Sequence, residues 1–210
     1  MLDGHGDPDV MSYSEVEQPR PRPGQVLIEV CATSVNRPDI IQRQGHYPPP
    51  PGESEILGLE AAGLVRALGD GVAGPEPGSR VTALLPGGGY AEYALAYSGH
   101  TIMIPDWMSC AQAACIPEAY LTAWQNVFLN AKLRDGETAL LHGGGGGVNT
   151  AAIQICRALT PAATIIVTAS SSKLERVLEL GADNVIDYQK TDFSKAVREL
   201  TNGDGADVIL

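Results

Sequence analysis

The chain has 210 residues, including 24 Gly and 15 Pro, and its 25 acidic against 14 basic side chains give a formal net charge of −11. That length supplies the core of one large domain or two small ones. The acidity argues against a nucleic-acid backbone or an anionic membrane as the main partner, and the longest apolar runs, such as residues 164–169, are too short to span a bilayer.

The N-terminus and the cysteines indicate the compartment. Residues 1–5 carry no basic region followed by an apolar run, so we expect no secretory signal and a cytoplasmic protein. The cysteines form no CxxC pair, and we interpret them as reduced thiols rather than as a zinc site or a disulfide framework. They are Cys31, Cys110, Cys115 and Cys156.

The first part of the chain predicts short β-strands joined by tight turns. Apolar residues, in part alternating with polar ones, mark strands over 25–31, 57–68, 80–84 and 90–94. Gly-containing turns at 69–71, 77–79 and 87–89 separate them. Residues 48–51 are consecutive prolines, which we interpret as a rigid loop rather than as a ligand for a Pro-binding module. We expect an irregular β-domain here.

After Ser109 the pattern becomes helical up to Leu133, broken by Pro117. Strands are then predicted over 138–141, 164–168, 184–188 and 206–210, alternating with helices over 148–159, 172–180 and 192–200. Ser172 and Glu175 predict a capping box for the second of these helices, and Asp192 or Thr191 is the expected cap of the third. Apolar strands alternating with helices predict a doubly wound parallel α/β sheet.

A run of glycines between the first strand and helix of this sheet predicts a dinucleotide site. Glycine lets the backbone approach a pyrophosphate, which then meets the free N–H groups at the helix N-terminus. Asn149 stands where a third Gly would allow close helix–strand packing, so its side chain must fit there or tilt the helix. The candidate cofactor-binding residues are Gly143, Gly144, Gly146, Gly147 and Val148.

The end of the second strand of this sheet predicts NADPH rather than NADH. An NAD site usually places an acidic residue there to hold the ribose 2′-OH. Residues 168–173 contain no acidic residue, and the first one that follows is Glu175. Ser170 and Lys173 would accept a 2′-phosphate, and Tyr188 could flank it or the adenine. The alternatives are that the serines only cap a helix and that Tyr188 only packs.

Several segments in the same order carry a family resemblance. The chain resembles the medium-chain dehydrogenase/reductase superfamily from about Val10 to Leu210, and within it the zinc-free quinone oxidoreductase (zeta-crystallin-like) group, most like its tumour-suppressor-induced branch. The matching segments are Asn36–Asp39, Gln42–Pro50, Ile56–Gly63, Ala83–Gly89, Ile116–Trp124 and Leu180–Ala182. The resemblance implies a GroES-like irregular β-barrel domain at residues 1–118 and a partial Rossmann NADPH-binding domain at 119–210.

The resemblance also bears on whether the chain binds zinc. Zinc-dependent relatives use Cys where this chain has Asn36, and Gly-His-Glu where it has Gly58-Leu59-Glu60. Asn and Leu supply neither thiolate nor imidazole for a tetrahedral zinc site, so we expect no metal and disfavour alcohol dehydrogenation.

By resemblance, NADPH would reduce a quinone or another activated alkene or carbonyl in a cleft between the domains. Asn36 and Tyr47 would donate hydrogen bonds to the substrate carbonyl, and Thr122 would contact the nicotinamide or its ribose. The alternatives are a turn cap for Asn36, a loop anchor for Tyr47 and an ordinary helix position for Thr122. Structural roles are expected for three further polar residues, Glu60, Glu118 and His142.

The predicted sheet has only four strands, whereas such folds commonly have six. We therefore expect a C-terminally truncated member, whose family would form homodimers through strands absent here. The expected partner is a small quinone or enone, with no nucleic acid and no membrane. Two alternatives stay open, namely a catalytically silent member with a binding or structural role, and an enoyl-thioester reductase.

Overall fold

The structure, a computed structural model, describes residues 1–210 and divides into two compact units, Met1–Glu118 (unit 1) and Ala119–Leu210 (unit 2). Each unit has its own buried apolar core. The expected mixed α/β class is confirmed, with an antiparallel sheet in unit 1 and a parallel sheet in unit 2.

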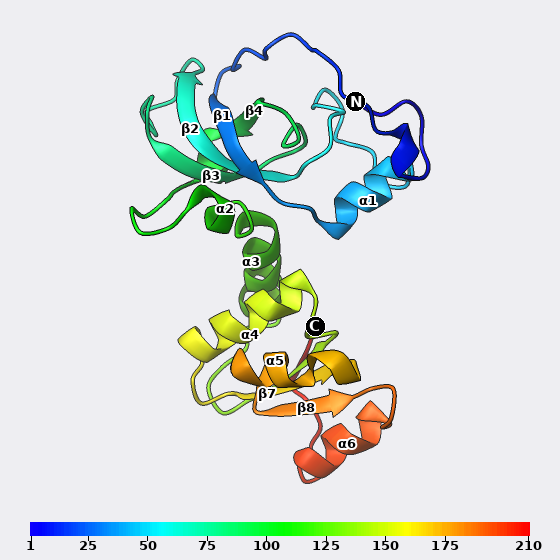
Figure 1. The fold of residues 1–210 in the computed structure, drawn as a ribbon. Coiled ribbons are helices and arrows are strands. Elements are labelled where there is room, and N and C mark those ends of the chain that lie inside the picture. The colour runs from blue at the N-terminus through cyan, green and yellow to red at the C-terminus, as the bar shows by residue number, and fades with distance from the viewer. The chain divides into compact units, whose positions relative to one another are not determined.

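Unit 1 is built on a curled antiparallel sheet with strand order β4-β1-β2-β3-β5 (Figure 1). Fully buried apolar side chains, among them Val26, Ile28, Val65 and Val81, fill the inside of the curl. Its strands are β1 Gln25–Thr33, β2 Glu60–Leu68, β3 Arg80–Leu84, β4 Tyr93–Tyr97 and β5 Thr101–Met103.

Strand β4 begins three residues later than the sequence pattern predicts. The Tyr90 N–H donates to the carbonyl of Leu57 and that of Gly89 to the carbonyl of Gly58, so this stretch forms a turn against the loop before β2. Tyr90 therefore serves a tertiary contact before the strand starts at Tyr93. Strand β5 was not predicted, since its three residues are too few for a periodic signal.

Unit 1 also contains four short helices and 3₁₀ turns. They are the 3₁₀ turns η1 Pro8–Val10 and η2 Ser98–His100 and the helices α1 Arg37–Arg43 and α2 Cys110–Ala113. Helix α1 was not predicted; it has Pro38 in its first turn, where the missing N–H costs nothing. Ser109 and Gln112 form a capping box that starts α2.

The helical stretch around Pro117 divides as its sequence suggests. Pro117 opens helix α3 Pro117–Trp124, which continues as a π-helical segment η3 Gln125–Asn130. Trp124 and Phe128 stack with ring centroids 5.2 Å apart.

Unit 2 contains the predicted parallel sheet, with strand order β8-β7-β6-β9. Leu141 and Val167 pack toward α4 and α5, whereas Leu140 and Ile166 pack toward α6, so the helices cover both faces (Figure 1). Because both faces are covered, the two central strands β6 and β7 contain continuous apolar runs at 139–141 and 165–167. The elements are β6 Thr138–His142, α4 Gly147–Leu159, β7 Thr164–Ala169, η4 Ser171–Lys173, α5 Leu174–Glu179, β8 Asn184–Asp187, α6 Phe193–Leu200 and β9 Val208–Ile209.

One predicted cap is wrong and another is confirmed. Ser172 does not cap a helix, because it lies inside the 3₁₀ turn η4, and α5 begins only at Leu174 without a side-chain cap. The Asp192 carboxylate caps α6 by accepting from the N–H groups of Ser194 and Lys195.

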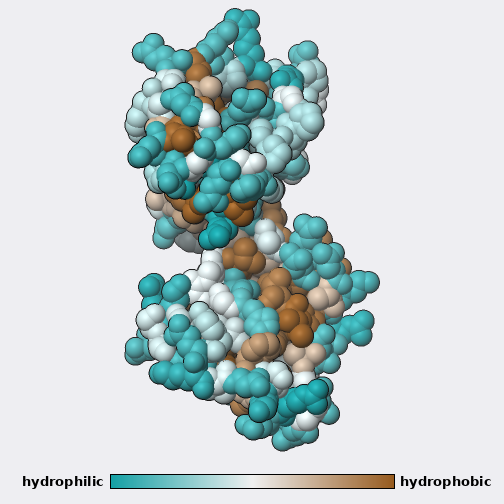
Figure 2. Space-filling model, turned by 90° about the vertical axis from the view of Figure 1, so that its right-hand side faces the viewer, coloured by the Kyte–Doolittle hydropathy of each residue, from teal (hydrophilic) through white to brown (hydrophobic).

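Apolar side chains gather on one face of unit 2 (Figure 2). The large apolar residues that remain exposed in this unit include Trp124, Leu129 and Ile209. None of the helices is both long and apolar enough to cross a membrane.

Candidate functional site

The glycine run of unit 2 forms a tight turn between β6 and α4. Gly143 adopts a left-handed φ of +75°, and its N–H donates to Thr168 Oγ1 over 3.1 Å. The Gly144 N–H donates to the carbonyl of the same Thr168 over 2.8 Å. The end of β7 therefore fixes the turn, a contribution of Thr168 that sequence reasoning missed.

One glycine of the turn is required by close packing. A Cβ on Gly144 would lie 2.1 Å from Cγ1 of the buried Val167, whereas one on Gly145 would meet only the flexible end of the Lys173 side chain, with Cδ at 2.2 Å. A Cβ on Gly147 would have only Ala119 Cβ as a neighbour, at 4.0 Å, so there is open space beside the backbone of this residue. The turn thus keeps its backbone bare at the N-terminus of α4, as close approach by an anion requires.

The first backbone N–H bonded within α4 is that of Thr150, which donates to the Gly146 carbonyl over 2.9 Å. The N–H groups of Gly147, Val148 and Asn149 precede it and have no backbone acceptor. Free N–H groups and the positive end of the helix dipole form the arrangement that binds a pyrophosphate. The site therefore fits a dinucleotide.

Asn149 fits its position by bonding to the end of the preceding strand. Its Nδ2 donates to the carbonyl of His142, the last residue of β6, while its Oδ1 is buried without a hydrogen-bond partner. The predicted conflict is thus resolved by a side-chain bond that ties α4 to β6.

Lys173 lies directly over the glycine turn. Its Nζ donates to the Gly145 carbonyl over 3.3 Å, and the side chain is otherwise exposed. Ser170 precedes η4 as its N-cap and is half-buried, while Tyr188 is 52% exposed. These three predicted phosphate-binding residues all lie at the carboxyl ends of β7 and β8.

Asp187 is a carboxylate at the same edge that sequence reasoning did not weigh. It accepts from the Ser171 hydroxyl and from the Gln189 N–H, and its Oδ2 lies 3.4 Å from Lys190 Nζ. The hydrogen bond from Ser171 holds the pKa of Asp187 below its usual range. The signal available in the sequence was its position at the end of the third strand of the parallel sheet.

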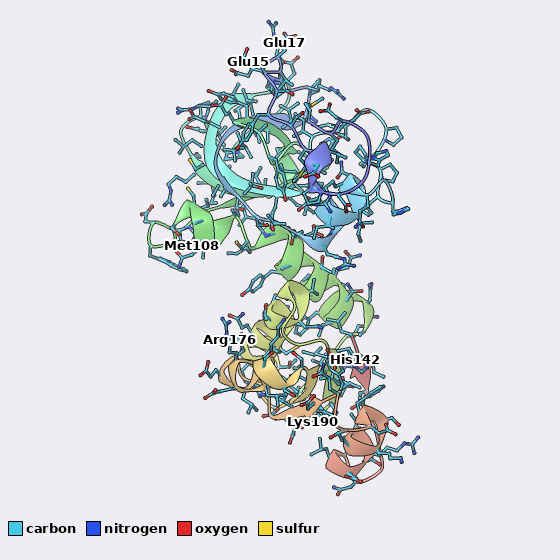
Figure 3. All side chains as sticks on the ribbon, turned by 45° about the vertical axis from the view of Figure 1, so that its right-hand side comes forward. Glu15, Glu17, Met108, His142, Arg176 and Lys190 are labelled. Carbon is cyan, nitrogen blue, oxygen red and sulfur yellow. The ribbon has the colours of Figure 1, made fainter.

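Thr122 and His142 are the remaining predicted residues of unit 2. Thr122 lies half-buried in α3, and its carbonyl accepts from Asn126 Nδ2 over 2.8 Å. The His142 ring bonds Thr168 Oγ1 through Nδ1 over 3.1 Å and packs edge-on against Phe193. Figure 3 labels His142 on unit 2. Both contacts of the ring are structural.

Unit 1 carries a separate polar cluster centred on Glu60, which is 1% exposed. Its Oε1 accepts from the Ser34 hydroxyl and, over 2.7 Å, from Asn36 Nδ2. Its Oε2 accepts from the Glu118 N–H over 2.8 Å. The buried carboxylate therefore joins the start of β2 to the segment after β1 and to the start of α3.

The Asn36 side-chain amide donates two hydrogen bonds inside this cluster, one to Glu60 and one to Ser34 Oγ over 3.0 Å. It is also the N-cap of α1, and its backbone N–H donates to Asp39 Oδ2 over 2.7 Å. The structure thus places Asn36 in the capping position that was the alternative interpretation. Tyr47 is 48% exposed, and its hydroxyl makes no hydrogen bond to the protein.

The carboxylates in and around this cluster raise the pKa values of neighbouring groups. Burial, then the charges of Glu60 and Asp39, raise the pKa of Glu118 above its usual value. The Tyr90 hydroxyl donates to Asp39 Oδ2 over 3.1 Å, and burial together with that carboxylate raises the pKa of Tyr90. Electrostatics here oppose any added negative charge.

Two family models match the chain. One is described as "Alcohol dehydrogenase GroES-like domain" and matches residues 22–106; the other is described as "Zinc-binding dehydrogenase" and matches residues 147–210. The two matches fall in the antiparallel and the parallel unit respectively.

Similar proteins include a polyketide synthase subunit and a quinone oxidoreductase. A phenolphthiocerol/phthiocerol polyketide synthase of Mycobacterium tuberculosis is 36% identical over 100% of this chain, which spans 10% of that relative. A Pseudomonas syringae quinone oxidoreductase structure superposes with TM-score 0.89 and 34% identity, covering 99% of this chain and 64% of that one.

Two further structures extend the range of chemistry. An NAD-dependent alcohol dehydrogenase gives TM-score 0.87 at 32% identity over 99% of this chain and 68% of that one. The CurK enoyl reductase gives TM-score 0.89 at 29% identity over 99% and 64%. The chain thus spans about two thirds of these solved chains.

A GroES-like antiparallel unit followed by a Rossmann-like parallel unit defines a class of nicotinamide-dependent oxidoreductases. The chain belongs to the medium-chain dehydrogenase/reductase superfamily, in its quinone oxidoreductase group.

Proposed function

We propose that this chain forms the substrate- and NADPH-binding part of a zinc-independent reductase that acts on a quinone or another activated alkene or carbonyl. The observation that carries the proposal is the glycine turn with Lys173 lying over it. An ammonium group beside free helix N–H groups, with no acid at the end of β7, suits a cofactor with one more phosphate than NADH.

In the proposed site the turn from Gly143 to Gly147 and the first N–H groups of α4 bind the pyrophosphate. Ser170 and Lys173 hold the 2′-phosphate, Tyr188 flanks it, and Thr122 meets the nicotinamide ribose. Asp187 orients Ser171, and Lys190 balances its negative charge close to the phosphate position. When bound, the cofactor supplies a hydride to an electron-poor carbon of the substrate.

In unit 1 the Tyr47 hydroxyl is the proposed donor to the substrate oxygen as negative charge develops on it. Asn36 is the second proposed donor. Its Nδ2 lies 3.0 Å from Ser34 Oγ and 2.7 Å from Glu60 Oε1. The amide proton that points at Ser34 is therefore the one proposed to turn to the substrate oxygen. Glu60 then keeps the amide oriented.

Zinc independence rests on residue identity. Asn36 and Leu59 offer no thiolate and no imidazole, Leu59 is 7% exposed, and the Asn36 amide is committed to Glu60. The second family model is described as zinc-binding, but these two positions of this chain supply no zinc ligand.

The test is titration of the purified chain with NADPH and with NADH, followed by nicotinamide fluorescence. Lys173→Met should weaken NADPH binding by about tenfold or more, as expected for the loss of one charged hydrogen bond, and leave NADH binding unchanged. Lys195→Met on α6, an exposed lysine whose side chain is 79% accessible, is the matched control and should change neither.

Equal weakening for both cofactors would assign Lys173 to the shared pyrophosphate and overturn the 2′-phosphate role. Failure of the unmodified chain to bind either cofactor would refute the cofactor site.

Enoyl-thioester reduction is a second candidate, favoured by the superposition on the CurK enoyl reductase and by the match to a polyketide synthase. NADPH oxidation by the purified chain with a small quinone and with crotonyl thioester separates the two. Preference for the thioester would replace the quinone proposal, and turnover of neither substrate would favour a catalytically silent role.

A further inference from the structure

A buried carboxylate lies beside the residues proposed to hold the 2′-phosphate. Asp187 ends β8 and pairs across the sheet with Ala169, the residue directly before Ser170. Its side chain is 9% exposed and accepts from the Ser171 hydroxyl and, through Oδ1 over 3.0 Å, from the Gln189 N–H. The bond from Ser171 keeps the pKa of Asp187 low, so the side chain is negatively charged at neutral pH.

This charge has the wrong sign for the cofactor proposed above. A phosphate monoester carries a charge of about −1.5 to −2 at pH 7, and a carboxylate close to it repels it. An acidic residue beside the adenosine ribose is instead what selects NADH, because it accepts from the free 2′-OH. A site that binds NADPH with Asp187 present therefore needs a cation between the carboxylate and the phosphate.

Lys190 meets this requirement. It lies in the turn that follows β8 (Figure 3), and its Nζ is 3.4 Å from Asp187 Oδ2. The N–H groups of Lys190 and Thr191 both donate to the Asp187 carbonyl, over 3.1 and 3.0 Å, so the turn holds the lysine beside the carboxylate. No other Lys or Arg pairs with Asp187.

Two ammonium groups near this edge of the sheet are free to turn toward a ligand. The Lys190 side chain is 71% exposed, and an exposed ion pair of this kind contributes little to stability. Lys173 makes one bond, to the Gly145 carbonyl, and is otherwise exposed. Lys173 follows β7 and Lys190 follows β8, and these strands are neighbours in the sheet. A phosphate bound at the carboxyl ends of the two strands would therefore meet one lysine from the segment after each.

We propose that Lys190 binds the 2′-phosphate of NADPH together with Lys173, and that Asp187 positions Lys190 for this contact. The inference rests on the cofactor site proposed above and names the pair that sets its preference. With Lys190 in place, its ammonium separates the phosphate from the carboxylate. Without it, the carboxylate repels the phosphate directly, so NADPH loses more affinity than the removal of one contact explains.

Such a pair makes the effects of two substitutions non-additive. Asp187→Asn keeps the size of the side chain and removes the charge. Its amide oxygen can still accept from the Gln189 N–H, and its NH₂ group can donate to the oxygen of the Ser171 hydroxyl. The loss caused by removing Lys190 should therefore be smaller when residue 187 is Asn than when it is Asp.

The experiment titrates the purified full chain with NADPH and with NADH and follows nicotinamide fluorescence. We expect Lys190→Met to weaken NADPH binding by about tenfold or more and to leave the binding of NADH, which lacks the phosphate, unchanged. Adding Asp187→Asn to this variant should recover about threefold or more of the loss, because it removes the repulsion. Lys190→Arg keeps the charge and should bind NADPH as the unmodified chain does.

Lys195→Met is the matched control. Lys195 forms the same i,i+3 pair with Asp192, over 4.0 Å, and its side chain is 79% exposed, but it lies on α6. Its replacement should change neither affinity. Because Lys190 is exposed, its variants should keep the melting temperature of the unmodified chain, which separates lost binding from lost folding.

The proposal is overturned if Lys190→Met weakens both cofactors equally, or if Asp187→Asn recovers nothing, since Lys190 would then only support the turn. A selective loss for Lys173→Met with none for Lys190→Met would also overturn it, while leaving the NADPH site of the proposed function standing. An unmodified chain without preference for NADPH would refute the proposed cofactor itself, and this inference with it.

Discussion

The Glu60 cluster allows a sharp test of how unit 1 is stabilised. We expect Glu60→Gln to lower the free energy of unfolding of unit 1 by about 2–4 kcal/mol. The carboxylate accepts three hydrogen bonds, from Ser34, Asn36 and the Glu118 N–H, at a residue that is 1% exposed. A glutamine amide offers one acceptor oxygen, so its NH₂ group must face at least one buried donor.

The magnitude follows from counting these bonds. A hydrogen bond to a charged group contributes about 1.5–3 kcal/mol, and a buried donor left without an acceptor costs about 1–3 kcal/mol. One bond is lost outright and the others become neutral and weaker. Relief of repulsion with Glu118 and Asp39 offsets part of this loss, which sets the lower end of the range.

The control is Glu29→Gln. Glu29 pairs with Arg66 on the surface of the same sheet, where the two side chains are 36% and 47% exposed, and such pairs contribute about 0–1 kcal/mol. Urea unfolding with hydrogen exchange of β1 and β2 peptides reports on unit 1 separately from unit 2. If the two variants lose equal stability, the Glu60 bonds do not hold the unit together.

Two further predictions concern single side chains. Gly144→Ala should lower the free energy of unfolding by about 1–3 kcal/mol because its Cβ would overlap Val167. Gly147→Ala, whose Cβ would lie 4.0 Å from its nearest neighbour, should leave the melting temperature nearly unchanged. Equal melting temperatures for the two variants would contradict the tight turn. The pKa of Glu118 is raised above 4.5 in the folded chain, so folded protein binds more protons than unfolded protein and stability falls as pH rises from that value. Glu118→Gln should therefore stabilise unit 1 in denaturant unfolding near neutral pH, with the gain vanishing in acid below the ordinary Glu pKa; a gain independent of pH would contradict the shift.

Local patterns in the sequence determine most of unit 2. The central strands β6 and β7 contain continuous apolar runs because helices cover both faces of the parallel sheet. Asp192 marks the start of α6 because its carboxylate accepts from the first N–H groups of the helix. The glycine run likewise signals a bare backbone at a strand-to-helix turn. These features depend on residues close together in the chain, so a single sequence can reveal them.

Features that depend on distant partners were decided only by the tertiary structure. Tyr90 lies in a turn rather than a strand because Leu57 takes its N–H, and Ser172 lies in a 3₁₀ turn rather than at a helix start. The bonds of the Asn36 amide and of the Glu118 N–H to Glu60 join segments far apart in sequence. Periodicity carries no information on such contacts, because they arise from the curl of the sheet and the packing of helices on it.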